Sequence, residues 1–244
     1  MRLGSKSPIA AIALSFCLVF GLCACSASNE TAKKTKDTVD VNVGYFAHFN
    51  EVPLIRQGTD YTCGIACLHS ILRWASVAGD INDERLAEAC GTTIADGTSY
   101  ERILQYMQGA DGLNTHWGEG MTDDDLRSVI DDGGVVMMPI QAWESKEGDS
   151  GESAWFDTQD YRDHWSGGHW VVACGYNDDA VLFMDPSTGG CYAQISWEAL
   201  DVRWHDSGDY VDDATPFTKM EHAGITVYKQ GDEVYDHNAV QPLR

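Results

Sequence analysis

The chain has 244 residues, 43% of them hydrophobic, and its 38 acidic and 16 basic side chains give a formal net charge of −22 at pH 7. This length is sufficient for one domain with a well-formed hydrophobic core. So acidic a surface argues against nucleic acid as a partner and favours cationic substrates, although charge alone identifies none.

Residues 1–24 are predicted to be an export signal rather than a part of the folded domain. Arg2 and Lys6 form a short basic segment, and residues 9–20 are an almost unbroken apolar run. This run is too short for a transmembrane helix and ends promptly, which is typical of a signal peptide.

Residues 22–25 have the sequence Leu-Cys-Ala-Cys, which resembles the lipobox of bacterial lipoproteins. The resemblance implies that Cys25 carries a lipid and anchors the chain to the outer face of the bacterial cell membrane. Residues 25–40 would then be a flexible tether to a domain spanning 41–244. The alternative is an ordinary signal peptide that leaves Cys25 as a free thiol.

The remaining chain has the pattern of helices followed by strands, which indicates an α+β domain. It is expected to enter the domain as extended chain over 41–55. Helical periodicity and capping residues predict helices over 63–77, 82 or 83–90, 98 or 99–107, and 122–131. Apolar runs between turns predict strands of a mainly antiparallel sheet over 135–141, 169–176, 181–185, 191–195 and 225–229. The three acids after Thr122 suit a helix start better than a calcium loop, because they lack the ligand spacing of such a loop.

A glutamine and a cysteine mark the start of the first predicted helix. Gln57 lies six residues before Cys63, and Cys63-Gly64 opens the apolar helical run. Unpaired backbone N–H groups and the helix dipole favour a thiolate at this position. The same groups suit an oxyanion, which the Gln57 amide and the Cys63 backbone N–H could bind together. The segment therefore predicts a cysteine nucleophile with an oxyanion hole.

His169 is the strongest candidate for the base because of the hairpin that follows it. Residues 169–176 and 181–185 are strand candidates on either side of a turn. If the pairing is centred on Asn177, His169 and Asp185 face each other at the open end of the hairpin. A shifted turn would make them diagonal neighbours. In either case the carboxylate could accept the imidazole N–H and stabilise the imidazolium.

The other histidines are weaker candidates. His164 is the reserve base, but it lies in a loop without a following strand or a paired carboxylate. His69, on the first helix, is expected to be structural. The polar, acidic stretch 143–165 is a candidate lid or cleft-forming loop. The histidines show no metal-ligand spacing, so we predict neither a zinc site nor a cofactor.

Four further cysteines have two interpretations. An exported protein can form disulfides, which would allow one or two bridges, whereas the alternative is four buried small side chains. The residue one turn after Cys63 lies on the apolar face of its helix and is expected in the core. The four cysteines are Cys67, Cys90, Cys174 and Cys191.

Taken in order, these motifs resemble the papain-like C39 cysteine peptidase family, best known for bacteriocin-processing peptidases that cut after double-glycine leaders. The resemblance covers roughly residues 50–200. It is carried by Gln-x5-Cys-Gly-x-Ala at 57–66, Gly-His-Trp-Val-Val at 168–172 and Asp-Pro at 185–186. It implies a helical N-terminal half that carries the cysteine and a C-terminal antiparallel sheet that carries the histidine and the aspartate.

The resemblance also implies four residue roles. Cys63 would be the nucleophile, His169 the general base and acid, Asp185 the residue that orients the imidazole, and Gln57 a donor in the oxyanion hole. Transporter-linked members of the family carry membrane-spanning and ATP-binding segments, and no such segment follows here. The double-glycine specificity is therefore not transferred to this chain.

The leading hypothesis is an extracytoplasmic cysteine peptidase acting on a peptide or protein substrate. An amidase or acyl transferase on cell-wall peptides would use the same residues, but no cell-wall-binding repeat favours it. A hypothesis from another class is a catalytically silent cell-surface lipoprotein that binds peptides with a peptidase-like fold.

Overall fold

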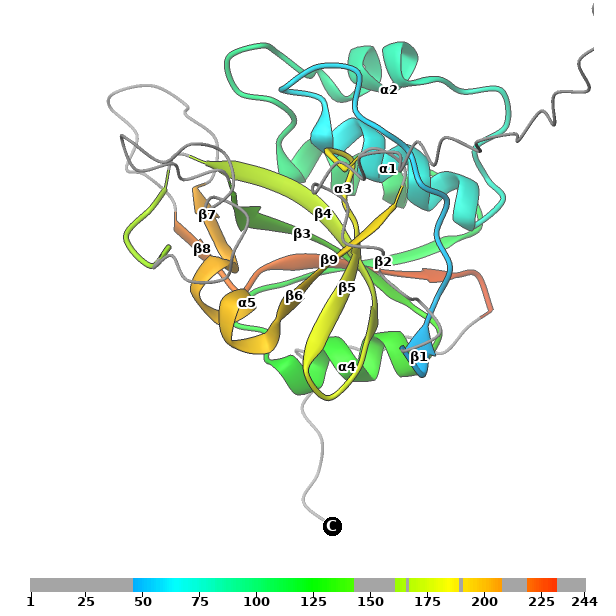
Figure 1. Cartoon of the computed structure of the whole chain (residues 1–244). Helices are drawn as coiled ribbons and strands as arrows, with labels where there is room; N and C mark the ends of the chain where they lie inside the picture. Colours follow the sequence, from blue (N-terminus) through cyan, green and yellow to red (C-terminus); the bar gives the residue numbers. More distant parts are fainter. Residues whose placement is uncertain (1–45, 143–160, 166, 189–190, 208–218, 232–244) are drawn as a thin grey trace, which may run out of the picture. The chain divides into compact units, whose positions relative to one another are not determined.

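An antiparallel sheet forms the centre of the fold (Figure 1). The computed structural model describes residues 46–142, 161–165, 167–188, 191–207 and 219–231, so the predicted signal peptide and tether lie outside the described part. The described strands of the main sheet are β1 (His48–Phe49), β2 (Leu113–Gly118), β3 (Val135–Gln141), β4 (Gly168–Tyr176), β5 (Ala180–Met184), β6 (Tyr192–Ser196) and β9 (Gly224–Lys229). Their order is β2-β9-β3-β4-β5-β6, with β1 beside the end of β4. A second sheet pairs β7 (His205–Ser207) with β8 (Lys219–Glu221).

Helices cover both faces of the main sheet and give it two apolar cores (Figure 1). On one face lie α1 (Cys63–Trp74), α2 (Asp83–Cys90) and α3 (Tyr100–Gln108), and on the other lie α4 (Asp123–Asp131) and α5 (Trp197–Arg203). In β4, Trp170 and Val172 belong to the first core, and Val171 and Ala173 to the second. Alternate side chains of this strand are thus buried on both sides, which explains its continuous apolar run. The α+β prediction is confirmed.

Local capping residues set most of the helix starts where the sequence predicts them. Asn82, Ser99 and Thr122 each accept a hydrogen bond from the backbone N–H three residues further on. Such caps satisfy donors that have no partner within the helix. Gly91, with a left-handed φ of 63°, ends α2.

The first helix ends earlier than the predicted residue 77. Ser76 has a left-handed φ of 62°. The N–H groups of Ser76 and Val77 donate back to the carbonyls of Arg73 and Leu72. This is the Schellman arrangement, which satisfies the last carbonyls of a helix. Val77 still packs against the core after the turn, so apolar periodicity overestimated the length of α1.

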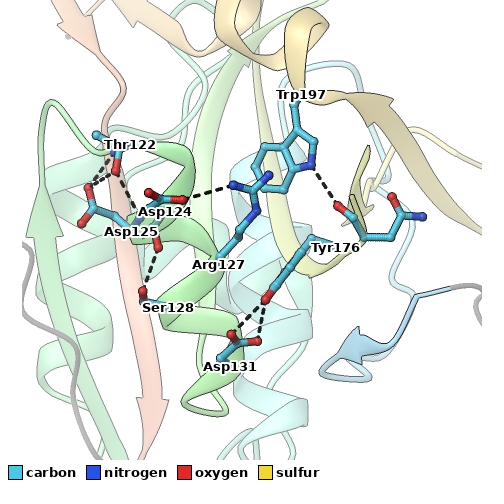
Figure 2. Close-up of polar contacts among 9 residues, drawn as sticks. Thr122, Asp124, Asp125, Arg127, Ser128, Asp131, Tyr176 and Trp197 are labelled. Carbon is cyan, nitrogen blue, oxygen red and sulfur yellow. Dashed lines mark hydrogen bonds and ion pairs between the residues drawn. The ribbon is translucent and has the colours of Figure 1, made fainter. Parts of the chain in front are cut away.

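Thr122 and one of the acids after it cap the start of α4, as Figure 2 shows. Thr122 and Asp125 form a reciprocal capping box, in which each side chain accepts from the backbone N–H of the other residue. This confirms the predicted helix start. Further along α4, Arg127 Nη1 donates to Asp124 Oδ1 at 3.2 Å, and its guanidinium lies 4.0 Å from the ring centroid of Trp197.

The β4–β5 hairpin has a register that differs from the predicted pairing centred on Asn177. The Asn177 side chain accepts from the N–H groups of Asp179 and Ala180, which moves the turn toward β5. Tyr176 therefore pairs with Val181. The shift arises because an Asx-type turn uses the asparagine side chain as a backbone mimic.

A bulge between Ala173 and Gly175 shifts the hairpin pairing once more, so that Val172 pairs with Met184. Asp185 then lies beside Val171 and two residues away from His169. The prediction of a directly opposed His169 and Asp185 is wrong. They are diagonal neighbours, which is the arrangement expected from a shifted turn.

Side-chain contacts fix the turn end of this hairpin to the helices (Figure 2). The Tyr176 hydroxyl donates to the Asp131 carboxylate, at 2.8 and 2.9 Å from its two oxygens. The Trp197 indole N–H donates to the Asn177 carbonyl at 3.0 Å. The opposite end of β4, which begins at Gly168, carries the candidate site.

Four described elements were not predicted: β2, α5, β7 and β8. β2 carries Asn114, Thr115 and His116 in succession and lacks strict apolar alternation, yet it pairs with β9 along its whole length. The other three are short and were not distinguished from loops. The stretch 41–55, predicted as extended, contributes only β1 within its described part.

Candidate active site

Cys63 is the first residue of α1, and it is buried at a helix end without a side-chain cap. The preceding Thr62 makes no cap hydrogen bond, because its hydroxyl lies 3.1 Å from the carbonyl and the hydroxyl oxygen of Thr59. The other helices in the described ranges all have a capping side chain. The first-turn N–H groups of α1 are therefore left to bind a negative charge beside the thiol.

Close packing brings the start of α1 against the start of β4. A Cβ on Gly64 would lie 3.2 Å from Trp170 Cδ1 and from Ile103 Cδ1, so only glycine allows this approach without displacement. The Trp170 indole N–H donates to the Thr98 carbonyl at 3.2 Å. The Cys67 thiol, one turn after Cys63, donates to the Trp170 carbonyl at 3.2 Å. These contacts place the residue before Trp170 in β4, His169, next to Cys63.

The His169 imidazole joins the thiol to a carboxylate. Its Nε2 lies 2.8 Å from Asp185 Oδ1, and the Cys63 thiol is close enough to the ring to affect its protonation. Since Nε2 is engaged by Asp185, Nδ1 is the nitrogen left for the thiol. Burial lowers the pKa of His169, but the hydrogen bonds to Asp185 and Cys63 and the negative charges of both groups outweigh burial and raise it to about 9.

Asp185 is itself held by a turn. Ser187 donates both its backbone N–H and its hydroxyl to Asp185 Oδ1, each at 2.8 Å. Burial raises the pKa of Asp185, but the hydrogen bond and charge of His169 and the hydrogen bonds from Ser187 outweigh burial, so the net shift is downward. The carboxylate therefore stays ionised beside the imidazole. The sequence analysis missed Ser187, which an Asp-Pro-Ser turn signal could have revealed.

Gln57 lies beside this arrangement, although its amide is partly engaged elsewhere. Its backbone N–H donates to the Pro186 carbonyl at 3.0 Å, which ties it to the residue after Asp185. Its side-chain Nε2 donates to the Thr59 carbonyl at 2.8 Å. An amide nitrogen carries two hydrogens, so one of them is used by this loop and the second is left for another acceptor. Its role in an oxyanion hole remains a prediction.

The raised pKa of His169 predicts how stability depends on pH. The folded state holds this proton more tightly than the unfolded chain, so the stabilisation is complete below about pH 6.5. It is lost as pH rises through about 9. We expect the free energy of unfolding of the wild type, relative to that of His169→Gln, to fall by on the order of 1–3 kcal/mol across this window. Urea unfolding at pH 6, 7.5 and 9.5 measures it, and parallel curves for the two proteins would contradict the prediction.

The remaining candidates have structural contacts. His69 Nδ1 lies 2.6 Å from Asp83 Oδ1 and links α1 to α2, which confirms its structural assignment. The carbonyl of His164 lies 2.8 Å from His205 Nε2. Of the predicted loop 143–165, only residues 161–165 are described, so its role as a lid stays a prediction.

The described cysteines are all free thiols. Three of the four with open interpretations are buried and the fourth is partly buried, which favours small packed side chains over disulfides. Burial raises the pKa of the Cys67 thiol well above its usual value, consistent with a hydrogen-bonded core residue. The buried three are Cys67, Cys90 and Cys174, and the fourth is Cys191.

The described part of the chain has neither a metal-binding cluster nor a membrane-spanning helix. No group of three or more His, Cys, Asp or Glu side chains there is placed to hold a metal ion. None of its helices combines the length and the apolar character needed to cross a bilayer.

The fold and this site define a class. A cysteine at a helix N-terminus, a histidine at the start of a strand and an aspartate after the next strand, on an α+β scaffold, are the arrangement of papain-like cysteine peptidases. The chain belongs to the Peptidase_C39 like family, whose model matches residues 49–211.

One solved structure supports this fold, and two others are similar to the chain at lower TM-scores. The chain is similar to a C39-like peptidase structure from Bacillus anthracis at 17% identity and a TM-score of 0.52, covering 74% of this chain and 96% of the other. A double glycine motif protease from an AMS/PCAT transporter, in complex with the leader peptide, matches at 18% identity and a TM-score of 0.44 over 75% and 94% of the two chains. The peptidase domain of Streptococcus ComA, a bi-functional ABC transporter of a quorum sensing pathway, matches at 14% identity and a TM-score of 0.42 over 73% and 98%. No curated protein matches the chain by sequence.

Proposed function

We propose that this chain is a cysteine peptidase that hydrolyses peptide bonds with Cys63, His169 and Asp185. The observation that carries the proposal is the position of the His169 ring, which hydrogen-bonds Asp185 through Nε2 and lies near the Cys63 thiol. A buried imidazole with these two partners serves to move a proton between the thiol and the substrate. Membership of a peptidase family supports the same reaction.

In the acylation step, Cys63 and His169 react as a thiolate–imidazolium pair, in which Nδ1 holds the proton given up by the sulfur, and the thiolate attacks the peptide carbonyl. The resulting oxyanion is bound by first-turn N–H groups of α1 and by the second N–H of the Gln57 amide. His169 then gives its proton to the leaving amine as the C–N bond breaks, which leaves a thioester on Cys63. Asp185 fixes the ring and stabilises the imidazolium throughout.

In the deacylation step, His169 takes a proton from water, and the hydroxide oxygen attacks the thioester carbonyl. The C–S bond breaks, the carboxylic acid product leaves, and the thiolate and the imidazolium that now holds the proton from water restore the starting pair. The balance needs only peptide and water. No cofactor enters the reaction.

Selective alkylation of the full chain tests the activated thiol. Because His169 holds a proton beside Cys63, we expect iodoacetamide at pH 7 to modify Cys63 well ahead of the buried Cys67, Cys90 and Cys174. His169→Ala should lower the Cys63 rate by about tenfold or more, since the positive charge beside the sulfur is lost. Peptide mapping by mass spectrometry assigns the label. Equal, slow modification of all the cysteines would contradict the proposal.

We also propose that the enzyme acts outside the cell membrane, held by a lipid on Cys25. The support is the resemblance of residues 22–25 to a lipobox and the basic and apolar segments before them. Metabolic labelling with a clickable palmitate, lost on Cys25→Ser, would identify this anchor.

A further inference from the structure

A second carboxylate, that of Asp206, lies next to the proposed base. Asp206 is in β7, and its two carboxylate oxygens would be 2.7 and 2.8 Å from a Cβ built on Gly168. Gly168 immediately precedes His169, whose imidazole is close enough to stabilise the Asp206 carboxylate electrostatically. The carboxylate therefore belongs to the same end of β4 as the Cys63–His169 pair.

A buried glutamine fixes the position of this carboxylate. Gln141, at the end of β3, donates from Nε2 to Asp206 Oδ1 at 3.0 Å and to the His205 carbonyl at 3.1 Å. Its Oε1 accepts from the Gly167 N–H at 2.9 Å. One amide thus joins β3, β7 and the residue before β4. Such a fully bonded support holds a binding group in a fixed geometry.

One oxygen of Asp206 is left for a further donor. Oδ1 accepts from Gln141 and, at 2.8 Å, from the backbone N–H of Ser207. No hydrogen bond to Oδ2 is found among the described residues. Asp206 is thus held by one oxygen while the other stays open.

The cationic side chains of the adjoining elements do not neutralise Asp206. Arg203 stacks on the Tyr161 ring at 3.8 Å, and the Lys219 ammonium lies 4.4 Å from the Trp165 ring centroid. Burial raises the pKa of Asp206 to about 6, although hydrogen bonds from Ser207 and Gln141 and the positive charge of His169 partly offset this shift. The group is therefore ionised at neutral pH with no lysine or arginine partner among the described residues, which is unfavourable for a partly buried carboxylate.

We propose that Asp206 determines specificity by binding a cationic group of the substrate, a lysine or arginine side chain or an amine, next to the scissile bond. This inference rests on the proposed peptidase function and adds a substrate class to it. The substrate's cation would supply the missing counter-charge of a fixed, half-satisfied carboxylate beside the nucleophile. Sequences without a cation near the cleaved bond would leave that partly buried carboxylate without a counter-charge.

The first test uses charged thiol reagents and needs no turnover. A cationic trimethylammonium-ethyl and an anionic sulfonatoethyl methanethiosulfonate react with Cys63 of the full chain, and peptide mapping measures each rate. The ratio of the cationic to the anionic rate removes differences in thiol reactivity. We expect Asp206→Asn to lower this ratio by about tenfold. The matched control Asp178→Asn removes an exposed carboxylate at the hairpin turn and should leave the ratio unchanged. An unchanged ratio in Asp206→Asn would overturn the inference.

The second test uses matched peptide substrates. Each pair carries either lysine or the uncharged norleucine at a position beside the cleaved bond. The wild type and Asp178→Asn should prefer the lysine peptide by about tenfold or more in kcat/KM, and Asp206→Asn should lose that preference. Cleavage with the same preference in Asp206→Asn overturns the inference and leaves the peptidase function standing. Peptides that no variant cleaves overturn the peptidase function, and the rate ratio at Cys63 then decides the role of Asp206.

Discussion

Replacing Cys63 by alanine is expected to abolish peptide hydrolysis, with a loss of at least about 10³-fold in kcat/KM. The sulfur is the atom that forms the thioester, and no neighbouring group can replace it, because Cys67 is fully buried and bonded to the Trp170 carbonyl. The measurement is the cleavage of a peptide library by the full chain and by Cys63→Ala under the same conditions.

The matched control for this experiment is Cys67→Ala, one helical turn away. This variant removes another thiol of the same helix. That thiol packs in the core and takes no part in the proposed reaction, so peptide cleavage should persist. Circular dichroism of Cys63→Ala should match that of the wild type. Cys63 is the first residue of α1 and its thiol does not cap the helix, so the helix should form without it. Cleavage that survives in Cys63→Ala would place the nucleophile elsewhere in the chain.

Replacing Asp185 by alanine is expected to lower kcat/KM by about 10²–10⁴-fold. Its Oδ1 accepts the His169 Nε2 hydrogen bond, so the variant loses both the orientation of the ring and the stabilisation of the imidazolium. Asp185→Asn keeps an acceptor of the same shape but no charge, and it should retain more activity than the alanine variant. The comparison separates orientation from charge.

The pH profile of kcat/KM gives a second readout of the same pair. The negative charge of Asp185 helps to raise the pKa of His169 to about 9. Removing that charge lowers the pKa of His169, so the loss of activity at alkaline pH should begin at a lower pH in Asp185→Asn than in the wild type. Asp178→Asn should keep the wild-type profile. An alkaline limb that does not move in Asp185→Asn would contradict the proposed contact.

The two carboxylates around His169 are assigned different tasks by their surroundings. Asp185 accepts the imidazole and two donors from Ser187, which keep its pKa low despite burial. Asp206 accepts from Gln141 and the Ser207 N–H, and burial raises its pKa to about 6. The first binds the imidazole of the proposed base directly, whereas the second accepts from Gln141 and the Ser207 backbone N–H through Oδ1 and has no hydrogen bond to Oδ2 among the described residues. This difference assigns orientation of the base to Asp185 and substrate recognition to Asp206.

Local signals determined the positions of the nucleophile and the base. The apolar period after Cys63, the caps at Asn82 and Ser99, and the continuous apolar run of β4 are encoded in neighbouring residues. Helix caps and strand patterns act over a few residues, so a single sequence displays them. The sequence thereby determined the α+β order of the elements and which residues stand at their ends.

The tertiary structure decided how those ends meet. The Asx turn at Asn177 and the bulge after Ala173 moved Asp185 from directly opposite His169 to a diagonal position. A single residue of register decides such a contact, and no local pattern distinguishes the registers. The position of the Asp206 carboxylate could not be predicted from the sequence for a similar reason. It reaches Gly168 only because Gln141 bridges segments that lie far apart along the chain, and contacts of that kind depend on packing rather than on the order of neighbouring residues.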